Sequence, residues 1–187
     1  DATTLEVVQD VTVPSQVRGE EFGPMALTVD PVGGKLYSVG LSTGEVVVLD
    51  GATGAVDTMF RFPTLNGGIG VAIDAEGRRL YATGQGSDNL IIANADTGEV
   101  LHDVYVGAGA VYVAFDPHSK LAYVASRGAG TITAVDANGQ IVANLDGGTF
   151  PNHVLPVGNG VLYAINKSRG ADDPNGDQIR RLVPKTN

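Results

Sequence analysis

A stretch of about 42 residues occurs four times along the chain, and this repetition limits the possible folds more than any other feature. The first three copies read VDPVGGKLYSVGLSTGEVVVLDGATGAV, IDAEGRRLYATGQGSDNLIIANADTGEV and FDPHSKLAYVASRGAGTITAVDANGQI. A more divergent fourth copy reads PVGNGVLYAINKSRGADDPNGDQIRRLV. The copies align on Tyr37, Tyr81, Tyr123 and Tyr163, which are spaced 44, 42 and 40 residues apart. A repeat of this length indicates an array of structural units that pack on one another.

Each copy divides into four short apolar runs separated by turn residues. In the second copy these runs lie at about 69–74, 79–84, 89–94 and 99–106. Four strands in about 42 residues are typical of one blade of a β-propeller. The sequence therefore predicts an all-β chain, a propeller of four-stranded antiparallel blades of the WD40 type. The single domain spans residues 1–187, and its blades are expected at about 23–63, 67–106, 109–147 and 151–183.

Aspartates recur at a fixed place in the repeat. Asp30, Asp74 and Asp116 each precede the aligning tyrosine by seven residues, in the stretches DPVGGK, DAEGRR and DPHSK. Asp side chains bind nearby backbone N–H groups in tight turns. We interpret these aspartates as turn residues and not as acid–base or metal-binding groups.

The first fourteen residues match the end of the first repeat. Residues 1–14 align without a gap on residues 50–63, so that Asp1 falls on Asp50 and Pro14 on Pro63. This alignment predicts an outer, fourth strand of a blade over residues 5–13. The fourth copy supplies three strands, at about 152–157, 161–166 and 178–183. The N-terminal strand could complete this C-terminal blade, which would remove a free sheet edge.

The repeats resemble the YVTN family of propellers, and most closely its YncE-like periplasmic members. The stretches that carry the resemblance are GRRLYATGQG, SKLAYVASRGAGTITAVDANGQIV, FPNHVLPVGNGVLYAI and DQIRRL. The resemblance implies a bacterial protein that is periplasmic or secreted. Members of that family typically carry seven blades, whereas this chain has strands for four.

Three ways to complete a ring remain open. In the first, the chain belongs to a longer protein that supplies the missing blades. In the second, two copies form a homodimer that closes one eight-bladed ring, each lending its N-terminal strand to the other. In the third, a single copy closes as a small four-bladed ring. We do not expect an isolated open half-ring, because it would expose apolar blade faces and sheet edges.

Composition excludes several classes of function. The formal net charge of -9 disfavours non-specific binding to nucleic acid. The absence of cysteine excludes disulfides, thiol catalysis and cysteine-bound zinc. The apolar runs are too short to span a bilayer, so we expect no membrane insertion. The sequence indicates no cofactor.

The irregular loops all emerge on one side of the predicted blades. The loops between the second and third strands and the links between blades share this side, which we call the loop face. Functional residues concentrate on loops held by a rigid scaffold. The candidate ligand-binding residues on this face are Arg127, His153, Lys167 and Arg169. These side chains could form a site for a small anionic ligand or an acidic protein partner. The alternative is that they are scattered, solvated side chains.

Two motifs fail on inspection. GLSTG matches the nucleophile elbow of hydrolases, but Ser42 is predicted between two strands, whereas that chemistry requires a strand followed by a helix. DDPNGD offers Asp173, Asn175 and Asp177 as weak metal-ligand candidates, but the glycine and the terminal glutamate of an EF-hand loop are missing. We therefore predict no metal site and no catalytic residue.

The favoured function is a non-catalytic propeller scaffold that binds a ligand or a protein partner through the loop face. One alternative is an enzyme, either a lactonase-like hydrolase or the propeller subunit of a periplasmic oxidoreductase. A metal-dependent lactonase is disfavoured, because the predicted channel-side starts of the first strands carry no carboxylate. Another alternative is a structural surface-layer repeat protein.

Overall fold

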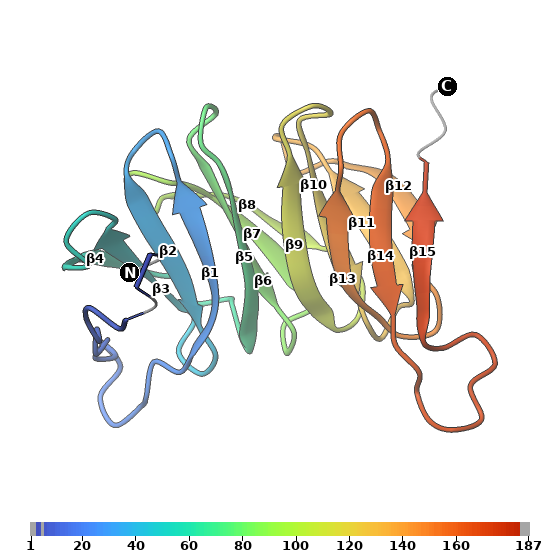
Figure 1. Cartoon of the computed structure of the whole chain (residues 1–187), viewed down its shortest axis with the longest axis horizontal. Coiled ribbons are helices and arrows are strands. Elements are labelled where there is room, and N and C mark those ends of the chain that lie inside the picture. The colour runs from blue at the N-terminus through green and yellow to red at the C-terminus, as the bar shows by residue number, and fades with distance from the viewer. Residues whose placement is uncertain (1–2, 5, 184–187) are drawn as a thin grey trace.

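A computed structural model describes residues 3–4 and 6–183 and places their fifteen strands in four antiparallel sheets (Figure 1). We call these sheets blades 1 to 4 in chain order. Within the described residues no helix is long and apolar enough to cross a membrane.

Each repeat forms one blade, and the strands of a blade follow one another in chain order. Blade 1 consists of β1 (Pro24–Asp30), β2 (Lys35–Gly40), β3 (Glu45–Asp50) and β4 (Val56–Arg61). Blade 2 consists of β5 (Gly68–Asp74), β6 (Arg79–Gly84), β7 (Asn89–Asn94) and β8 (Val100–Tyr105). Blade 3 consists of β9 (Ala110–Asp116), β10 (Leu121–Ser126), β11 (Thr131–Val135) and β12 (Ile141–Asp146). Blade 4 has three described strands, β13 (Pro151–Pro156), β14 (Leu162–Asn166) and β15 (Gln178–Leu182). The predicted fold class is thereby confirmed.

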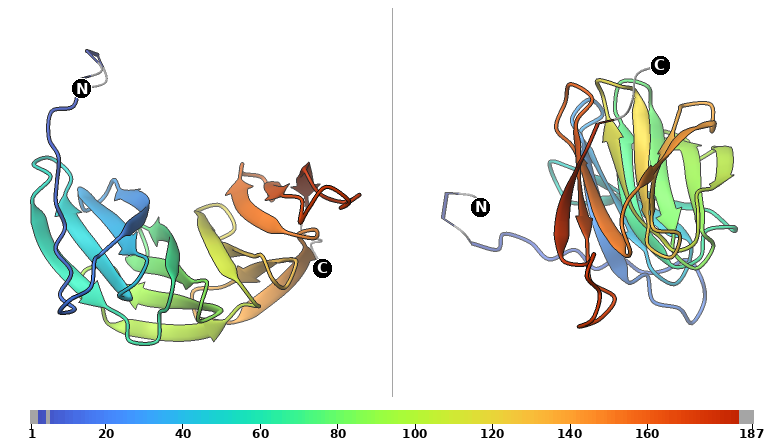
Figure 2. Two further views of the ribbon diagram at one scale, coloured as in Figure 1. Left: turned by 90° about the horizontal axis from the view of Figure 1, so that it is seen from below. Right: turned by 90° about the vertical axis from the view of Figure 1, so that its right-hand side faces the viewer.

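The four blades lie along an open arc, with blades 1 and 4 at its two ends (Figure 2). The first strands of neighbouring blades contact one another, β1 with β5, β5 with β9 and β9 with β13. The first strands therefore line the inside of the arc. Blades 1 and 4 lie apart at the two ends of the arc, so the described chain does not close on itself (Figure 2). The alternative of a single copy that closes as a small four-bladed ring is therefore wrong.

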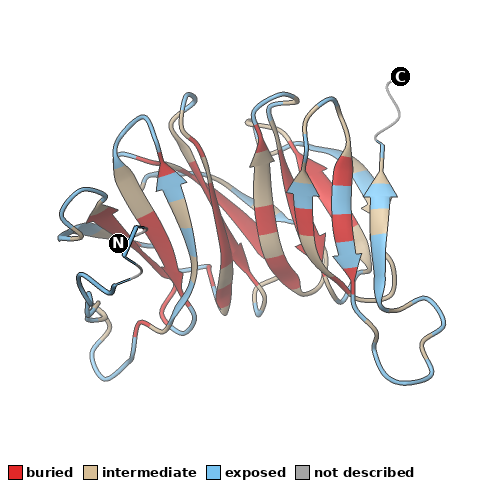
Figure 3. Cartoon of the chain, viewed as in Figure 1, coloured by how far each residue is buried: buried red, intermediate tan, exposed pale blue. Residues whose placement is uncertain are grey.

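The central strands of the inner blades are largely buried (Figure 3), and the buried clusters between blades consist of apolar side chains. Alternate residues of a strand point to opposite faces, so a blade that packs on both sides is apolar at nearly every position of its central strands. Tyr37, Tyr81 and Tyr123 are each at most 1% exposed in such interfaces. Between blades 1 and 2, Tyr37 belongs to the same buried cluster as Val46, Leu80 and Ile91.

The recurring aspartates form turns, as predicted. Oδ1 of Asp30 accepts hydrogen bonds from the backbone N–H groups of Val32 and Gly33, and Asp74 and Asp116 accept equivalent bonds in blades 2 and 3. Asp30 also binds Arg78 of blade 2, whose Nη1 lies 2.6 Å from its Oδ2. Burial would raise the pKa of Asp30, but the hydrogen bonds from Gly33 and Arg78 outweigh it and lower that pKa. The turn thus fixes blade 2 against blade 1.

The N-terminal segment differs from its predicted place. The sequence predicts an outer strand over residues 5–13, but residues 6–13 belong to no sheet, and residue 5 lies outside the described residues. Ser15 Oγ and the backbone N–H of Gln16 donate hydrogen bonds to the buried carboxylate of Glu45 in β3, at 2.9 and 2.8 Å. The segment therefore lies against blade 1. A strand needs a sheet edge to pair with, and the predicted edge, β15, is at the other end of the arc (Figure 2).

We expect Tyr81→Phe to leave the free energy of unfolding unchanged or to raise it slightly, whereas Tyr37→Phe should lower it by about 1 kcal/mol. Both rings are fully buried, and the Tyr37 hydroxyl donates to the carbonyl of Ala95 at 3.1 Å. The buried Tyr81 hydroxyl has no hydrogen-bond partner among the described residues. Urea denaturation of the two variants measures the difference, and an equal loss in both would contradict it.

Arg78→Met should lower the free energy of unfolding at neutral pH by about 1–3 kcal/mol, because it leaves the buried Asp30 carboxylate without its charged partner. Lys120→Met is the matched control, since it removes an exposed ion pair between blades, the one with Glu76, and should lower the free energy of unfolding much less. Because the pKa of Asp30 is lowered in the folded chain, its stabilisation is complete above about pH 4 and is lost on further acidification. The difference in free energy of unfolding between wild type and Arg78→Met should shrink over that acid range. A difference that does not depend on pH would refute this account.

Candidate functional site

The loop face is held together by hydrogen bonds between each link and the following loop. Gln85 N donates to Gly67 O at 2.8 Å, Arg127 N donates to Gly109 O at 2.8 Å, and Lys167 N donates to Phe150 O at 3.1 Å. These bonds occur at the same place in blades 2, 3 and 4. The link before a blade therefore fixes the backbone position of the first loop residue after its second strand.

Phe150 is fixed from several sides at the junction of blades 3 and 4. Its backbone N–H donates to Oδ1 of Asn166 at 2.7 Å, and Asn166 is fully buried. Gly148 precedes it with a φ of +101°, and a Cβ at that position would lie 2.3 Å from Cγ of Asn166. Glycine is therefore required where the link passes Asn166. These contacts fix the Phe150 backbone in place.

Two arginines lie over this ring. Cζ of Arg127, from the loop after β10, is 4.8 Å from the centroid of Phe150, and Cζ of Arg169, from the loop after β14, is 5.6 Å from it. Arg127 also donates from Nη2 to Oδ1 of Asn152. Asn152 stands at the register shift between Pro151 and His153, an irregularity that redirects a side chain. We call Arg127, Phe150, Asn152 and Arg169 the Phe150 cluster.

The Phe150 cluster has the chemistry of an anion site. A guanidinium over an aromatic face keeps its N–H groups available at its rim, where they match the oxygens of a carboxylate or phosphate. Nε of Arg127 is buried and has no hydrogen-bond partner among the described residues. A buried donor without a partner is costly, and an acceptor that reached it would remove that cost.

The other two predicted side chains lie beside the cluster. The ring of His153 packs on Tyr112, with 3.6 Å between ring centroids. Burial lowers the pKa of His153, so the imidazole is neutral at neutral pH and adds no charge. Lys167 contributes its backbone N–H to Phe150, while its side chain is exposed. The structure thus brings Arg127 and Arg169 together on Phe150, but not all four predicted side chains on one point.

The weak metal-ligand candidates organise the loop that carries Arg169. Oδ2 of Asp173 accepts hydrogen bonds from Thr149 Oγ1 at 2.6 Å and from Arg169 N at 3.1 Å. The bond from Thr149 is the main cause of the lowered pKa of Asp173. Asp177 accepts from the backbone N–H of Ser168, and Asn175 binds through its backbone to Asp173 and Asn166. Over the described residues, no group of three or more acidic, histidine or cysteine side chains has the arrangement of a metal site.

Sequence reasoning missed Phe150 and Asn166 as the centre of the site. The stretch GGTFPNH does contain a signal, since a lone aromatic residue follows two glycines in an irregular link. The pairing of two distant arginines on one ring has no sequence signature, because their loops are neighbours only in the folded arc.

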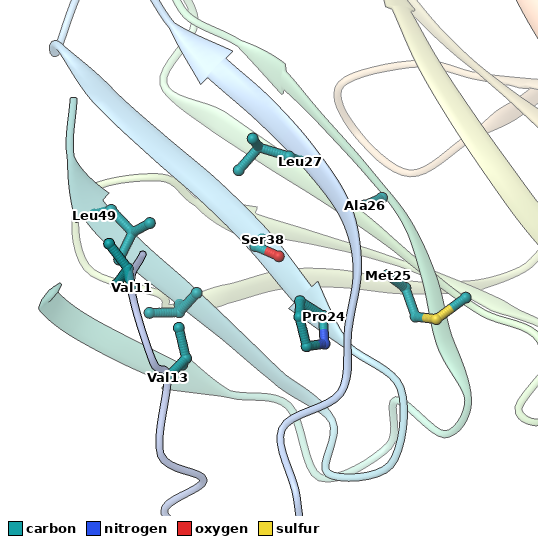
Figure 4. Close-up of a pocket in the computed structure, with 9 residues that line it drawn as sticks. Val11, Val13, Pro24, Met25, Ala26, Leu27, Ser38 and Leu49 are labelled. Carbon is teal, nitrogen blue, oxygen red and sulfur yellow. The ribbon is translucent and has the colours of Figure 1, made fainter. Parts of the chain in front are cut away.

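A hollow of about 320 Å³ lies between the N-terminal segment and blade 1, away from the Phe150 cluster (Figure 4). Its lining is almost entirely apolar, with Ser38 as the exception among Val11, Val13, Pro24, Met25, Ala26, Leu27, Val47 and Leu49. Of the lining residues, Leu27, Ser38, Val47 and Leu49 lie on the face of blade 1 that points away from blade 2, whereas Ala26 packs on the cluster between the two blades. The hollow is therefore part of a blade-packing surface.

Comparison with solved structures places the chain in a class. No protein-family model matches the sequence, and no curated protein does. Hydrazine synthase from Kuenenia stuttgartiensis superposes with a TM-score of 0.78 at 20% identity, over 95% of this chain and 49% of that one. The Pan2 WD40 domain from Neurospora crassa superposes with a TM-score of 0.65 at 12% identity, over 85% of this chain and 48% of that one. BamB from Moraxella catarrhalis superposes with a TM-score of 0.58 at 19% identity, over 75% of this chain and 39% of that one.

The chain has the fold of part of a β-propeller. It spans about half the length of hydrazine synthase and of the Pan2 domain, and less of BamB. Similarity at these identities concerns the fold alone. Membership of the YVTN family remains a prediction from the repeats.

Asp173→Ala should increase the rate at which trypsin cuts the chain after Lys167 and Arg169, because the mutation removes the carboxylate that ties this loop to Thr149. Asp172→Ala is the matched control, since the neighbouring Asp172 is exposed and makes none of these bonds. Mass spectrometry of timed digests identifies the cut sites. Equal rates in the two variants would show that Asp173 does not hold the loop.

Proposed function

We propose that this chain is a non-catalytic propeller scaffold that binds an anionic group at the Phe150 cluster. The observation that carries the proposal is the pair of guanidiniums on one ring in a chain of net charge -9. Positive charge gathered at one place on an acidic surface attracts carboxylates to that place and repels them elsewhere.

The ligand class follows from the donors available. The cluster offers N–H groups and positive charge, and Asn152 adds an amide beside Arg127. The neighbouring imidazole of His153 packs on the tilted ring of Tyr112, and this contact does not join it to a hydroxyl or thiol nucleophile. Donors without an activated nucleophile suit binding better than hydrolysis. We therefore favour the carboxylates of an acidic protein segment or of a small anionic ligand.

The resemblance to YncE-like proteins supports a periplasmic or extracellular location. That location belongs to the proposal, and so does the bacterial source. The ring is completed either by further blades or by a second copy of the chain.

The test uses a fluorescein-labelled hexaglutamate peptide and measures its anisotropy as the whole chain is added at low salt. We expect the wild-type chain to bind the peptide saturably. The double variant Arg127→Ala and Arg169→Ala should weaken the affinity at least about tenfold, because it removes the charge-assisted hydrogen bonds. Arg61→Ala is the matched control, because Arg61 is an exposed arginine on β4 of blade 1 and should leave binding unchanged.

Competition with free glutamate separates the two ligand sources. If free glutamate displaces the labelled peptide at a carboxylate concentration similar to that of unlabelled hexaglutamate, the site takes a small ligand. If only unlabelled hexaglutamate displaces it, the site takes an acidic segment. Equal binding by wild type and the double variant would reject the site. No binding at all would favour the purely structural surface-layer role.

A further inference from the structure

The two ends of the arc expose blade faces that are otherwise buried in this fold. The trailing face is the side of blade 4 that points away from blade 3, and it carries Leu155, Tyr163, Ile165 and Ile179. These four side chains are 53%, 39%, 44% and 77% exposed. Tyr163 aligns with Tyr37, Tyr81 and Tyr123, which are at most 1% exposed in their blade interfaces. The trailing face is therefore one half of a blade interface.

The leading face is the side of blade 1 that points away from blade 2. Strand register places Leu27, Ser38 and Val47 in one row across it and Val29, Leu36 and Leu49 in the next. Leu27 and Val29 are 61% and 59% exposed. The N-terminal segment covers part of this face, where Val11 and Val13 line the hollow of Figure 4.

The two faces are complementary because they continue the same repeat. Inside the arc, the face of blade 1 that carries Tyr37 packs on the face of blade 2 that carries Leu80 and Ile91. By alignment, Tyr163 corresponds to Tyr37, while Leu36 and Val47 correspond to Leu80 and Ile91. The trailing face is thus equivalent to the Tyr37 face of blade 1, and the leading face is equivalent to the face of blade 2 that packs on it. We propose that a second copy of this chain packs its leading face on the trailing face and adds its residues 7–12 to β15 as the fourth strand of blade 4.

The repeat also fixes the register of this added strand. In blade 1, Val46 pairs with Phe60 and Val47 with Met59 across β3 and β4. Ile179 and Arg180 take the places of Val46 and Val47 in β15, because they pair with β14 in the same way. The alignment of residues 1–14 on 50–63 then sets Val11 of the second copy opposite Ile179 and Asp10 opposite Arg180. An apolar pair lies beside a pair of opposite charges, and both combinations stabilise neighbouring strands.

Such a joint forms twice between two copies. Blade 4 of each copy receives the N-terminal strand and the leading face of the other, and a two-fold axis relates the two joints. The result is a closed ring of eight blades in which every sheet has four strands. The inference concerns the ends of the arc and does not depend on ligand binding at the Phe150 cluster.

Light scattering on a sizing column measures the absolute mass of the whole chain. We expect twice the 19.2 kDa of one copy. Ile179→Asp should shift the mass to that of one copy, because it places a charge in the centre of the joint. Ile179 is 77% exposed in the single chain, so this substitution leaves the folded copy intact, which circular dichroism verifies.

A disulfide tests the register directly, because the natural chain contains no cysteine. Val11→Cys combined with Ile179→Cys should give a covalent dimer on a non-reducing gel, since directly opposed residues have Cα atoms within disulfide range. Val7→Cys combined with Ile179→Cys is the matched control. In the proposed register Val7 lies four residues from Val11 along the strand, about 13 Å away, and should not cross-link.

Three results would overturn the inference. One is a wild-type mass of one copy at the highest soluble concentration. Another is that the Ile179→Asp variant still has the mass of two copies. The third is equal cross-linking by the Val11 and Val7 pairs, which would mean that the segments meet without the proposed register. A dimeric sample that does not bind hexaglutamate would count against ligand binding at the Phe150 cluster and not against the dimer.

Discussion

The packing of one blade face on the next is the interaction on which the rest of this structure depends. Each face contributes a patch of apolar side chains, and Tyr37, Tyr81 and Tyr123 each place a large ring in one of the three interfaces. A single twisted sheet of four strands would expose both faces to water, so a blade is stable only between neighbours. The same requirement explains why the ends of the arc differ from its middle in exposure.

The Phe150 cluster is a consequence of this stacking. Arg127 belongs to blade 3, Phe150 to the link and Arg169 to blade 4. Hydrogen bonds between link and loop hold the backbones of Arg127 and Phe150, and Asp173 holds the backbone of Arg169. Charge is therefore gathered at a junction between blades, where the loops of both are close. The scaffold supplies rigidity, and the irregular loops supply the chemistry.

The repeat, the strands and the turn aspartates could be predicted because each depends on local pattern. Alternation in apolar runs and aspartates at fixed phase act within a few residues, and Asp30 forms the hydrogen bonds that its place in the repeat indicates. The site was predictable only in part. Arg127 and Arg169 stood out as cations on one face, but Phe150 became visible only when both arginines were found on its ring, since that contact depends on the angle between two blades.

By itself the sequence determined the class of fold, the order of strands within each blade and the side on which the irregular loops emerge. These features follow from a repeat of about 42 residues with local turn chemistry. Only the tertiary structure decided that one chain forms an open arc and that residues 6–13 lie against blade 1 without joining a sheet. The reason is physical: curvature accumulates from many small angles between packed faces, and a strand forms only where a free edge is within reach.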